Sequence, residues 1–287
     1  MDTAAFYVED LHYTYPASKT HALKGISFDV REGEVFGLLG PSGAGKSTAQ
    51  KIMFKLLEDY TGNIRYFGRD LKSLGTSFYE EVGVGFEVPV HFTKLTAMEN
   101  MRFFMQFYKK TADVRALMER VGLWQYRDIK VGEFSKGMKV RLNFVRAMLN
   151  APRVLFLDEV TNGLDPKNAK IIKEMITEFR DGGGTVFLTT HLMNDVEQLC
   201  GRIAFCVEGE IHEIATPREL KLRYGKREVK VEYLEDGATA QAVFPLEGIG
   251  NNEEFRAILG TKQIETIHSG ETSLEEIFII MTGVDLK

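Results

Sequence analysis

The stretch Gly40-Pro41-Ser42-Gly43-Ala44-Gly45-Lys46-Ser47 decides the fold, because it matches the phosphate-binding pattern G-x-x-x-x-G-K-[ST] at every specified position. The apolar run Val35–Leu39 precedes it and predicts a buried strand, and residues Ser47 to Leu57 predict a helix. A glycine-rich loop between a strand and a helix points several backbone N–H groups at one phosphate. The alternative, a glycine-rich turn that carries a lysine by chance, does not account for the strand and helix on either side.

This loop predicts binding of a nucleoside triphosphate with Mg²⁺. Lys46 can reach the β- and γ-phosphates, and the Ser47 hydroxyl can coordinate Mg²⁺. Thr48 lies one position further along and can contact an α-phosphate oxygen. The loop alone does not separate kinases, GTPases and motor ATPases, because all of them use it.

Composition bounds the remaining possibilities. The chain has 287 residues, 44% of them apolar, and a net charge of −5, which gives no support to direct nucleic-acid binding. The last 62 residues, 226–287, hold 6 basic and 12 acidic residues, a net of −6, while the rest holds 30 basic and 29 acidic. We expect anionic lipid headgroups and nucleic acid to repel this acidic tail.

The cysteines and the N-terminus indicate in which cellular compartment we expect the protein. Cys200 and Cys206 are too few for a disulfide scaffold or a zinc site, and reduced thiols fit a cytosolic protein. Residues 1–5 lack the basic and apolar regions of a signal peptide, and no window approaches 18 uninterrupted apolar residues. We therefore expect any membrane role to come through a partner.

Strand and helix patterns alternate along the chain, which predicts an α/β fold. Three apolar runs predict buried parallel strands: Val35–Leu39, Val154–Leu157 and Thr185–Thr189. Asp165-Pro166 predicts the start of a helix that Gly182 ends. We expect a nucleotide-binding domain over 1–225 with a helical subdomain at about 88–150.

The remaining residues, 226–287, predict a small α+β accessory domain. Glu228–Leu234 alternates in the manner of a strand. Ser273 and Glu276 form the pattern of a capping box for a helix that Gly283 ends.

Two carboxylates follow the second apolar run. Asp158 and Glu159 stand at the carboxyl end of a predicted central strand, where ligands bind in open α/β sheets. Asp158 suits a Mg²⁺ ion held through water, and Glu159 suits the polarisation of an attacking water. The alternative is an exposed acidic turn after a core strand; the phosphate-binding loop favours the functional interpretation.

Two further segments are ordinary when taken alone. Ser135, in Phe134-Ser135-Lys136-Gly137-Met138, has the pattern of a helix N-cap, and a plain cap is the simplest interpretation. His191 follows the third apolar run, and a lone histidine is usually structural. Its place at a strand terminus beside two phosphate motifs makes it a candidate for contact with the γ-phosphate.

Taken together, these motifs resemble the ATP-binding subunits of ABC transporters, in the order typical of that family, over residues 4 to 220. The resemblance implies a P-loop NTPase core, with Phe134–Met138 as the signature, Leu157-Asp158-Glu159 as the Walker B end, Asn162–Asp165 as the D-loop and His191 as the switch histidine. It implies that Ser135, Lys136 and Gly137 contact nucleotide and that Glu159 and His191 are catalytic. Tyr15 resembles the aromatic residue that stacks on adenine; Tyr13 is the rival, and a merely structural tyrosine is the alternative for both.

Two positions depart from the family pattern. Glu87 stands where a glutamine is usual; a carboxylate can still ligate Mg²⁺, but it adds negative charge near the triphosphate. Lys136 replaces the first glycine of the signature pair, while Ser135 and Gly137 remain.

The resemblance also implies partners. In the family, the signature of one subunit closes over the phosphate loop of the other, so we expect a second ATPase subunit, in the simplest case a copy of this chain. A separate transmembrane permease would hold the pair at the cytoplasmic face of the membrane by inserting a short helix into a groove near Val88–Tyr108. Phe92 and Leu95 are candidate contacts, and a helical core is the alternative for most aromatics there.

The C-terminal pattern Ser273–Phe278 narrows the resemblance to bacterial exporters. Two other functions stay open. A soluble ABC protein acting on ribosomes or nucleic acid would usually carry two ATPase domains or long coiled coils. A regulator that binds nucleotide without hydrolysis is suggested by Glu87 and Lys136 and opposed by Glu159 and His191.

Overall fold

The computed structural model describes residues 4–16 and 18–284. The chain divides into two compact units between Thr216 and Pro217. The sequence predicted a boundary after Gly225, nine residues later. The difference arises because α8 (Pro217–Tyr224) packs against α10 (Leu274–Thr282), which places α8 in the second unit.

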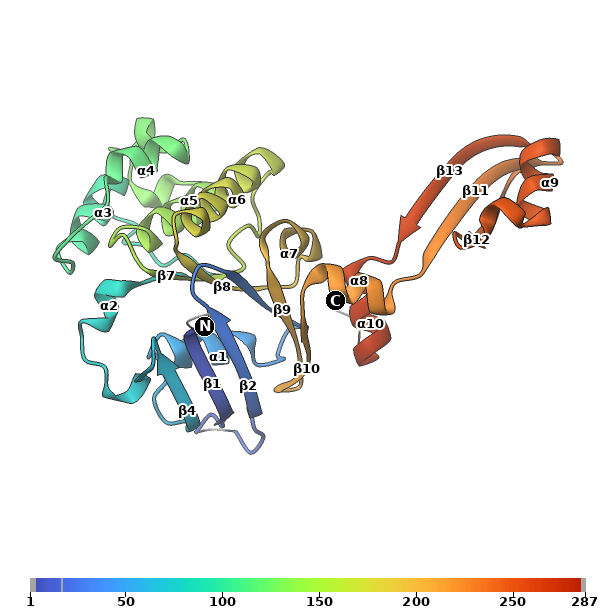
Figure 1. Ribbon diagram of the computed structural model, residues 1–287. Helices are drawn as coiled ribbons and strands as arrows, with labels where there is room; N and C mark the ends of the chain where they lie inside the picture. The colour runs from blue at the N-terminus through green and yellow to red at the C-terminus, as the bar shows by residue number, and fades with distance from the viewer. Residues whose placement is uncertain (1–3, 17, 285–287) are drawn as a thin grey trace. The chain divides into compact units, whose positions relative to one another are not determined.

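A six-stranded sheet forms the centre of the first unit (Figure 1). Its strand order is β10-β9-β3-β8-β7-β6, and only β10 runs antiparallel to its neighbour. The strands are β3 (Val35–Leu39), β6 (Val82–Gly85), β7 (Val154–Asp158), β8 (Thr185–Thr190), β9 (Arg202–Val207) and β10 (Glu210–Ala215). The three predicted apolar runs are thus neighbours, β3-β8-β7, and the predicted α/β class is confirmed.

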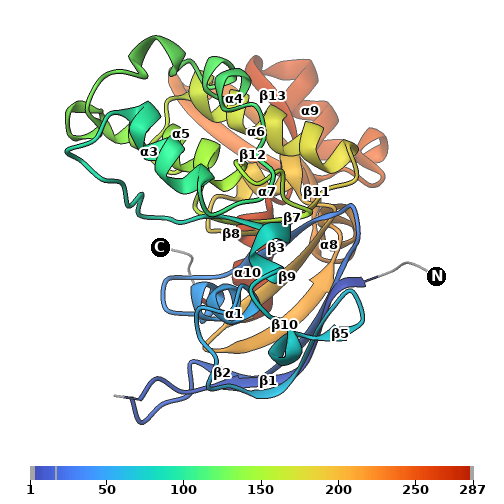
Figure 2. The same ribbon diagram turned by 90° about the vertical axis from the view of Figure 1, so that its left-hand side faces the viewer.

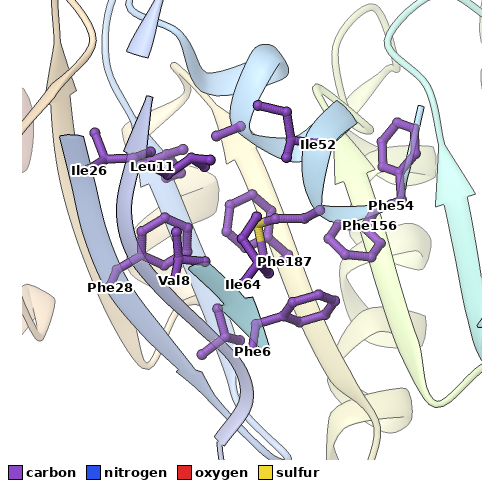
Figure 3. Packing of buried hydrophobic residues seen from close by; sticks show 14 of the residues in the cluster. Phe6, Val8, Leu11, Ile26, Phe28, Ile52, Phe54, Ile64, Phe156 and Phe187 are labelled. Carbon is purple, nitrogen blue, oxygen red and sulfur yellow. The ribbon is translucent and has the colours of Figure 1, made fainter. Parts of the chain in front are cut away.

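A four-stranded antiparallel sheet, ordered β2-β1-β4-β5, packs against the first. Its strands are β1 (Ala4–Tyr13), β2 (Leu23–Arg31), β4 (Thr61–Tyr66) and β5 (Arg69–Asp70). Figure 3 shows that side chains from β1 and β2 meet those of α1 (Lys46–Met53), β7 and β8 in one core. Phe28 stacks on Phe36, with ring centroids 5.5 Å apart, so aromatic packing joins the two sheets beneath the phosphate-binding loop.

The helix after this loop is shorter than the sequence predicted. The apolar residues up to Leu57 indicated a helix of eleven residues, but α1 ends at Met53. Phe54 leaves the helical conformation, and Lys55 has a left-handed φ of 60°. The chain turns here because Phe54 enters the aromatic core and the Lys55 ammonium donates to the Leu74 carbonyl.

Helices cover the other face of the six-stranded sheet (Figures 1 and 2). Between β6 and β7 the described residues hold helices and no sheet strand, apart from an isolated bridge between Thr96 and Lys130. Besides α1, the helices of the first unit are α2 (Phe78–Glu81), α3 (Ala97–Met105), α4 (Val114–Arg120), α5 (Lys136–Ala147), α6 (Pro166–Asp181) and α7 (Met193–Leu199), with 3₁₀ turns at Leu71–Ser73, Trp124–Tyr126 and Val131–Glu133.

The expected caps are present: Ser135 accepts from Met138 N, and Asp165 accepts from Asn168 N with Pro166 following.

The second unit is a small α+β structure, as predicted. Its antiparallel sheet, ordered β12-β11-β13, consists of β11 (Arg227–Glu235), β12 (Ala238–Pro245) and β13 (Gln263–Glu271). Helix α9 (Glu253–Thr261) follows a 3₁₀ turn at Ile249–Asn251 and covers one sheet face, where Val231 and Ile258 are buried. The predicted capping box of Ser273 and Glu276 begins α10, and Gly283 ends it.

The close approach of β6 to α5 predicts a specific weakness. A Cβ added to Gly83 would lie 1.9 Å from the Ala147 carbonyl oxygen, so strand and helix would have to separate. We expect Gly83→Ala to lower the free energy of unfolding by about 2 kcal/mol or more, measured by urea denaturation. Gly75→Ala is the matched control, because an added Cβ there meets nothing within 4 Å; equal stability of the two variants would contradict this packing.

Candidate nucleotide-binding and catalytic site

The phosphate-binding loop, Gly40 to Gly45, connects β3 to α1, and one side of it packs against the C-terminal end of β9. A Cβ on Gly40 would lie 1.9 Å from the Cys206 carbonyl oxygen, so only glycine allows this approach of the two backbones. The Cys206 thiol donates to the Ala44 carbonyl at 3.0 Å, and Gly209 N donates to the same oxygen at 3.0 Å. These contacts fix the loop's far side while leaving its other face free to meet a ligand.

Burial keeps the Cys206 thiol protonated. It raises the pKa of this group to about 11, so the thiol remains a hydrogen-bond donor at neutral pH. The sequence indicated only a reduced cysteine here. Its contact with the loop was missed because Cys206 and Ala44 are far apart in the chain and no short motif joins them.

The Lys46 side chain lies inside the curve of its own loop. Its Nζ donates to the Gly40 carbonyl at 2.6 Å and to the Pro41 carbonyl at 2.9 Å. An ammonium has three N–H donors, so one remains for a phosphate oxygen. Burial lowers the pKa of Lys46, and nearby carboxylates, among them Glu159, Asp158 and Glu87, oppose that shift. The loop lysine and the predicted acidic residues therefore share one electrostatic environment.

Glu159 and His191 are in direct contact. Glu159 Oε1 lies 2.7 Å from His191 Nδ1 and accepts from the His191 backbone N–H at 3.1 Å. Because a carboxylate only accepts, Nδ1 carries the proton of this bond and Nε2 is left facing outward from a ring that is 44% exposed. Two residues 32 positions apart, which the sequence assigned separately to catalysis, thus form one unit.

The backbone at Glu159 has an unusual conformation. Its φ of 49° lies in the left-handed region, which a residue with a side chain rarely adopts. The conformation is held because Glu159 N donates to the Thr189 carbonyl at 2.9 Å. Its side chain is thereby turned back toward β8, where it is buried, and away from the solvent that an acidic turn would face.

Two threonines complete the carboxylate contacts. Thr189 Oγ1 donates to Asp158 Oδ1, and Thr190 Oγ1 donates to Glu159 Oε2 at 3.1 Å. Both threonines come from the end of β8, just before His191, and both are buried. The sequence analysis treated them only as strand residues. Two hydroxyls at the end of an apolar strand, next to a histidine, were the available signal.

The structure separates the two tyrosines that competed for the adenine-stacking role. Tyr13 is buried in the core of the first unit, with 5% of its surface exposed. Tyr15 is 37% exposed, and its hydroxyl lies 3.0 Å from Thr48 Oγ1 on the helix that follows the loop. Tyr15 is therefore the tyrosine with an accessible ring beside the phosphate-binding loop.

The signature residues lie apart from that loop within the same unit. Ser135, Lys136 and Gly137 begin α5, and Figures 1 and 2 show α1 and α5 on opposite faces of the six-stranded sheet. The Lys136 side chain instead covers Gly163, and Gly137 lies beside Leu164. The predicted signature and D-loop are thus neighbours on one surface.

The predicted magnesium ligands come from the same edge of the sheet. Ser47 is in the first turn of α1, Asp158 ends β7 and Glu87 is exposed just after β6. Among the described residues, no three His, Cys, Asp or Glu side chains gather into a metal centre. The donor set still suits Mg²⁺ bound with a triphosphate, because that ion takes one or two protein oxygens and completes its shell with phosphate and water.

Comparison with known proteins agrees with this geometry. Residues 23–162 match the family described as ABC transporter, and residues 227–271 match the fluoroquinolone efflux ABC transporter C-terminal domain. The chain is 44% identical over 286 residues to a fluoroquinolones export ATP-binding protein of Mycobacterium tuberculosis, covering 99% of this chain and 95% of that protein.

The chain belongs to the ABC transporter ATP-binding proteins.

Two further proteins agree with this membership. A linearmycin resistance ATP-binding protein of Bacillus subtilis is 37% identical over 72% of this chain and 68% of its own length. A solved ATP-binding subunit of an ABC transporter superposes with a TM-score of 0.70 at 27% identity, over 77% of this chain and 93% of that one. This chain is accordingly an ABC ATPase and the ATP-binding subunit of an exporter.

ABC ATPases form dimers and work with transmembrane proteins. Within residues 4–16 and 18–284, no helix of this ABC ATPase has the length and apolar character needed to cross a membrane.

A hollow of about 330 Å³ lies in the first unit, near the segment Val88–Tyr108 that was predicted to form a groove. It is surrounded by the residues just after α1, by β6 and by side chains of α2, α3 and α5. Phe86, Phe104 and Arg146 are among its lining residues, and the Arg146 guanidinium lies 5.1 Å from the Phe104 ring centroid. Phe92 is 45% exposed and packs on Phe103, with ring centroids 4.8 Å apart, whereas Leu95 is less exposed and partly buried. Neither Phe92 nor Leu95 is among the residues that line this hollow.

The threonine contact generates a test of the catalytic unit. We expect Thr190→Val to lower kcat for ATP hydrolysis about tenfold with little change in ATP affinity, because the carboxylate loses one of the donors that orient it. Thr190→Ser keeps the hydroxyl and is the matched control. Steady-state phosphate release and nucleotide titration measure the two quantities; a loss of affinity with unchanged kcat would contradict this role for Thr190.

Proposed function

We propose that this ABC ATPase hydrolyses ATP with Glu159 as general base and His191 as the group that contacts the γ-phosphate. The observation that carries the proposal is the Glu159–His191 contact of 2.7 Å beside the loop that holds Lys46. Glu159 Oε1 and Oε2 are fixed by three donors, so the carboxylate is oriented before substrate arrives. Nε2 of His191, which is not used in the contact with Glu159, would bind a phosphate oxygen.

The remaining site residues have roles that follow from their positions. The Gly40–Ser47 backbone and the third Lys46 donor would bind the β- and γ-phosphates, Thr48 the α-phosphate, and the Tyr15 ring the adenine. Ser47 and Asp158 would hold Mg²⁺, with Glu87 in reach through water. The ion supplies charge neutralisation to the triphosphate when bound.

We infer that a second ATPase subunit completes the site. The N-terminus of α5 presents Ser135 and Gly137 on a surface away from this subunit's own loop, so those residues can bind only a nucleotide held elsewhere. The exposed ammonium of Lys136 lies on the same surface and is suited to an anion. ATP between two copies would then act as the contact that holds them together, and hydrolysis would weaken it.

Export proceeds through a separate permease in this proposal, which places the ATPase pair peripherally at the cytoplasmic face of the membrane. The hollow around Phe86 and Phe104 is lined mainly by apolar side chains together with the cations Lys55 and Arg146, and Leu56 and Phe86 in it are exposed, as expected of a site for a short amphipathic helix. One relative that matches almost the whole chain is named as a fluoroquinolones export protein and another relative as a linearmycin resistance protein, so we propose that the cargo is a drug-like small molecule.

Glu159→Gln tests the catalytic assignment. We expect kcat to fall at least about 100-fold, while ATP still binds and a dimer accumulates, because the amide keeps the shape of the side chain but cannot take a proton. Phosphate release and light scattering with ATP are the measurements. Glu174→Gln, on the exposed face of α6, is the control. Intact hydrolysis would remove Glu159 as the base, and silence of the unaltered protein beside its permease would favour a nucleotide-dependent regulator.

Leu56 tests the docking hollow. It lines the hollow and is 58% exposed. We expect Leu56→Glu to abolish co-purification with the permease and to leave the unstimulated ATPase rate unchanged, because the new carboxylate would lose its water shell when a permease helix covers it. Leu222→Glu is the matched control, since Leu222 is also 58% exposed but lies in the second unit. Retention of the permease by Leu56→Glu would exclude this surface.

A further inference from the structure

A hollow of about 530 Å³ lies wholly within the second unit, on the sheet face that α9 does not cover. Alternate residues of β11 and the segment just before it, Lys226, Glu228 and Lys230, point into it, while Val229 and Val231, which alternate with them along β11, are buried on the opposite face. Helix α10 contributes Ile279 and Ile280. The nucleotide site and the permease hollow described above use none of these residues.

Strand register brings the hollow's floor together. Lys230 is paired with Val243 on β12 and with His268 on β13, so these three side chains form one row across the sheet. In the next row, Glu228 is paired with Gly270, which has no side chain to fill the space. A Cβ added to Gly270 would meet nothing within 4 Å. Gly270 thus leaves room in the hollow beside the row of Lys230 and α10.

The lining combines an apolar wall with charges of both signs. Val243, Ile279 and Ile280 are 49%, 39% and 58% exposed, which is high for apolar side chains that share one concave surface. Lys230 is already paired with Glu232 at 3.2 Å, and Glu276 is engaged in the cap of α10. Lys226 and Glu228 form no ion pair within the described residues. One cation and one carboxylate are thus left to bind a ligand.

We propose that this hollow binds a flat aromatic carboxylate that also carries a basic amine, the chemical class to which fluoroquinolones belong. The carboxylate would pair with Lys226, the amine with Glu228, and the ring system would cover the wall of Ile279 and Ile280. The volume is that of a site for a drug-sized molecule. The choice of ligand class rests on the proposed drug-export function, but the site itself is separate from ATP hydrolysis.

The test is direct binding of norfloxacin to the full purified chain, without permease or nucleotide. Binding is measured through the polarisation of the drug's own fluorescence. We expect saturable binding that Lys226→Glu weakens at least about tenfold. Arg256→Glu makes the same change of charge on exposed α9 and should alter affinity by about twofold or less. Norfloxacin ethyl ester, which lacks the carboxylate charge, should bind the unaltered chain about tenfold more weakly.

Gly270→Leu gives an independent arm, because it fills the hollow where the backbone has room and leaves every charge in place. We expect it to abolish norfloxacin binding while ATP hydrolysis persists. Absence of saturable binding by the unaltered chain would overturn the proposal, as would binding by Lys226→Glu and Gly270→Leu that equals that of the unaltered chain. Loss of self-association in Gly270→Leu, measured by light scattering, would also overturn it and assign the hollow to a second copy of the chain. Neither result depends on whether the ATPase turns over.

Discussion

The Glu159 carboxylate is held against the end of β8, and the rest of the site depends on that contact. The left-handed backbone at Glu159 turns the side chain inward, where Thr190 and His191 donate to it. This is possible only because β7 and β8 are adjacent and parallel, so their carboxyl ends meet at one edge of the sheet. The β3 strand ends at the same edge and delivers Lys46. The two sheets and their aromatic core fix this edge, and the charges placed there account for the chemistry.

Much of this arrangement could be predicted from the sequence, because it depends on local signals. The residues that form the loop pattern are close together in the sequence, and so are the residues of each apolar run and of each cap, at Ser135, Asp165 and Ser273. The structure confirms these elements. Contacts between distant segments could not be read in this way. Thr190 and Cys206 act on residues 31 and 162 positions away, and no spacing rule connects them. The sequence misplaced the end of α1 and the boundary between the units for the same reason. The contact of Lys55 with Leu74 decides the first, and the packing of α8 against α10 decides the second.

The two units illustrate different uses of charge. In the first, acidic side chains lie near the buried Lys46, and two of them, Asp158 and Glu159, accept hydrogen bonds from threonines at the end of β8. In the second, residues 217–230 carry six basic and two acidic residues, while 231–285 carry two basic and eleven acidic. Two of these cations, Lys226 and Lys230, line the hollow together with Glu228 and Glu276, although the overall charge of the unit is negative. The acidity of the tail as a whole gave no indication of the basic segment 217–230.

Helix α5 has a mechanical consequence. Its first residues, Lys136 and Gly137, belong to the predicted signature, and Arg146 near its other end lines the proposed permease hollow, where it contacts Phe104. Twelve residues of α-helix form a rod about 18 Å long, which bends little over that length. A displacement of one end of the helix would therefore move the other end as well. Such a displacement would need no hinge and no unfolding of the helix. The distance that the permease end of α5 moves would therefore be set by how far the two proposed ATPase subunits approach each other.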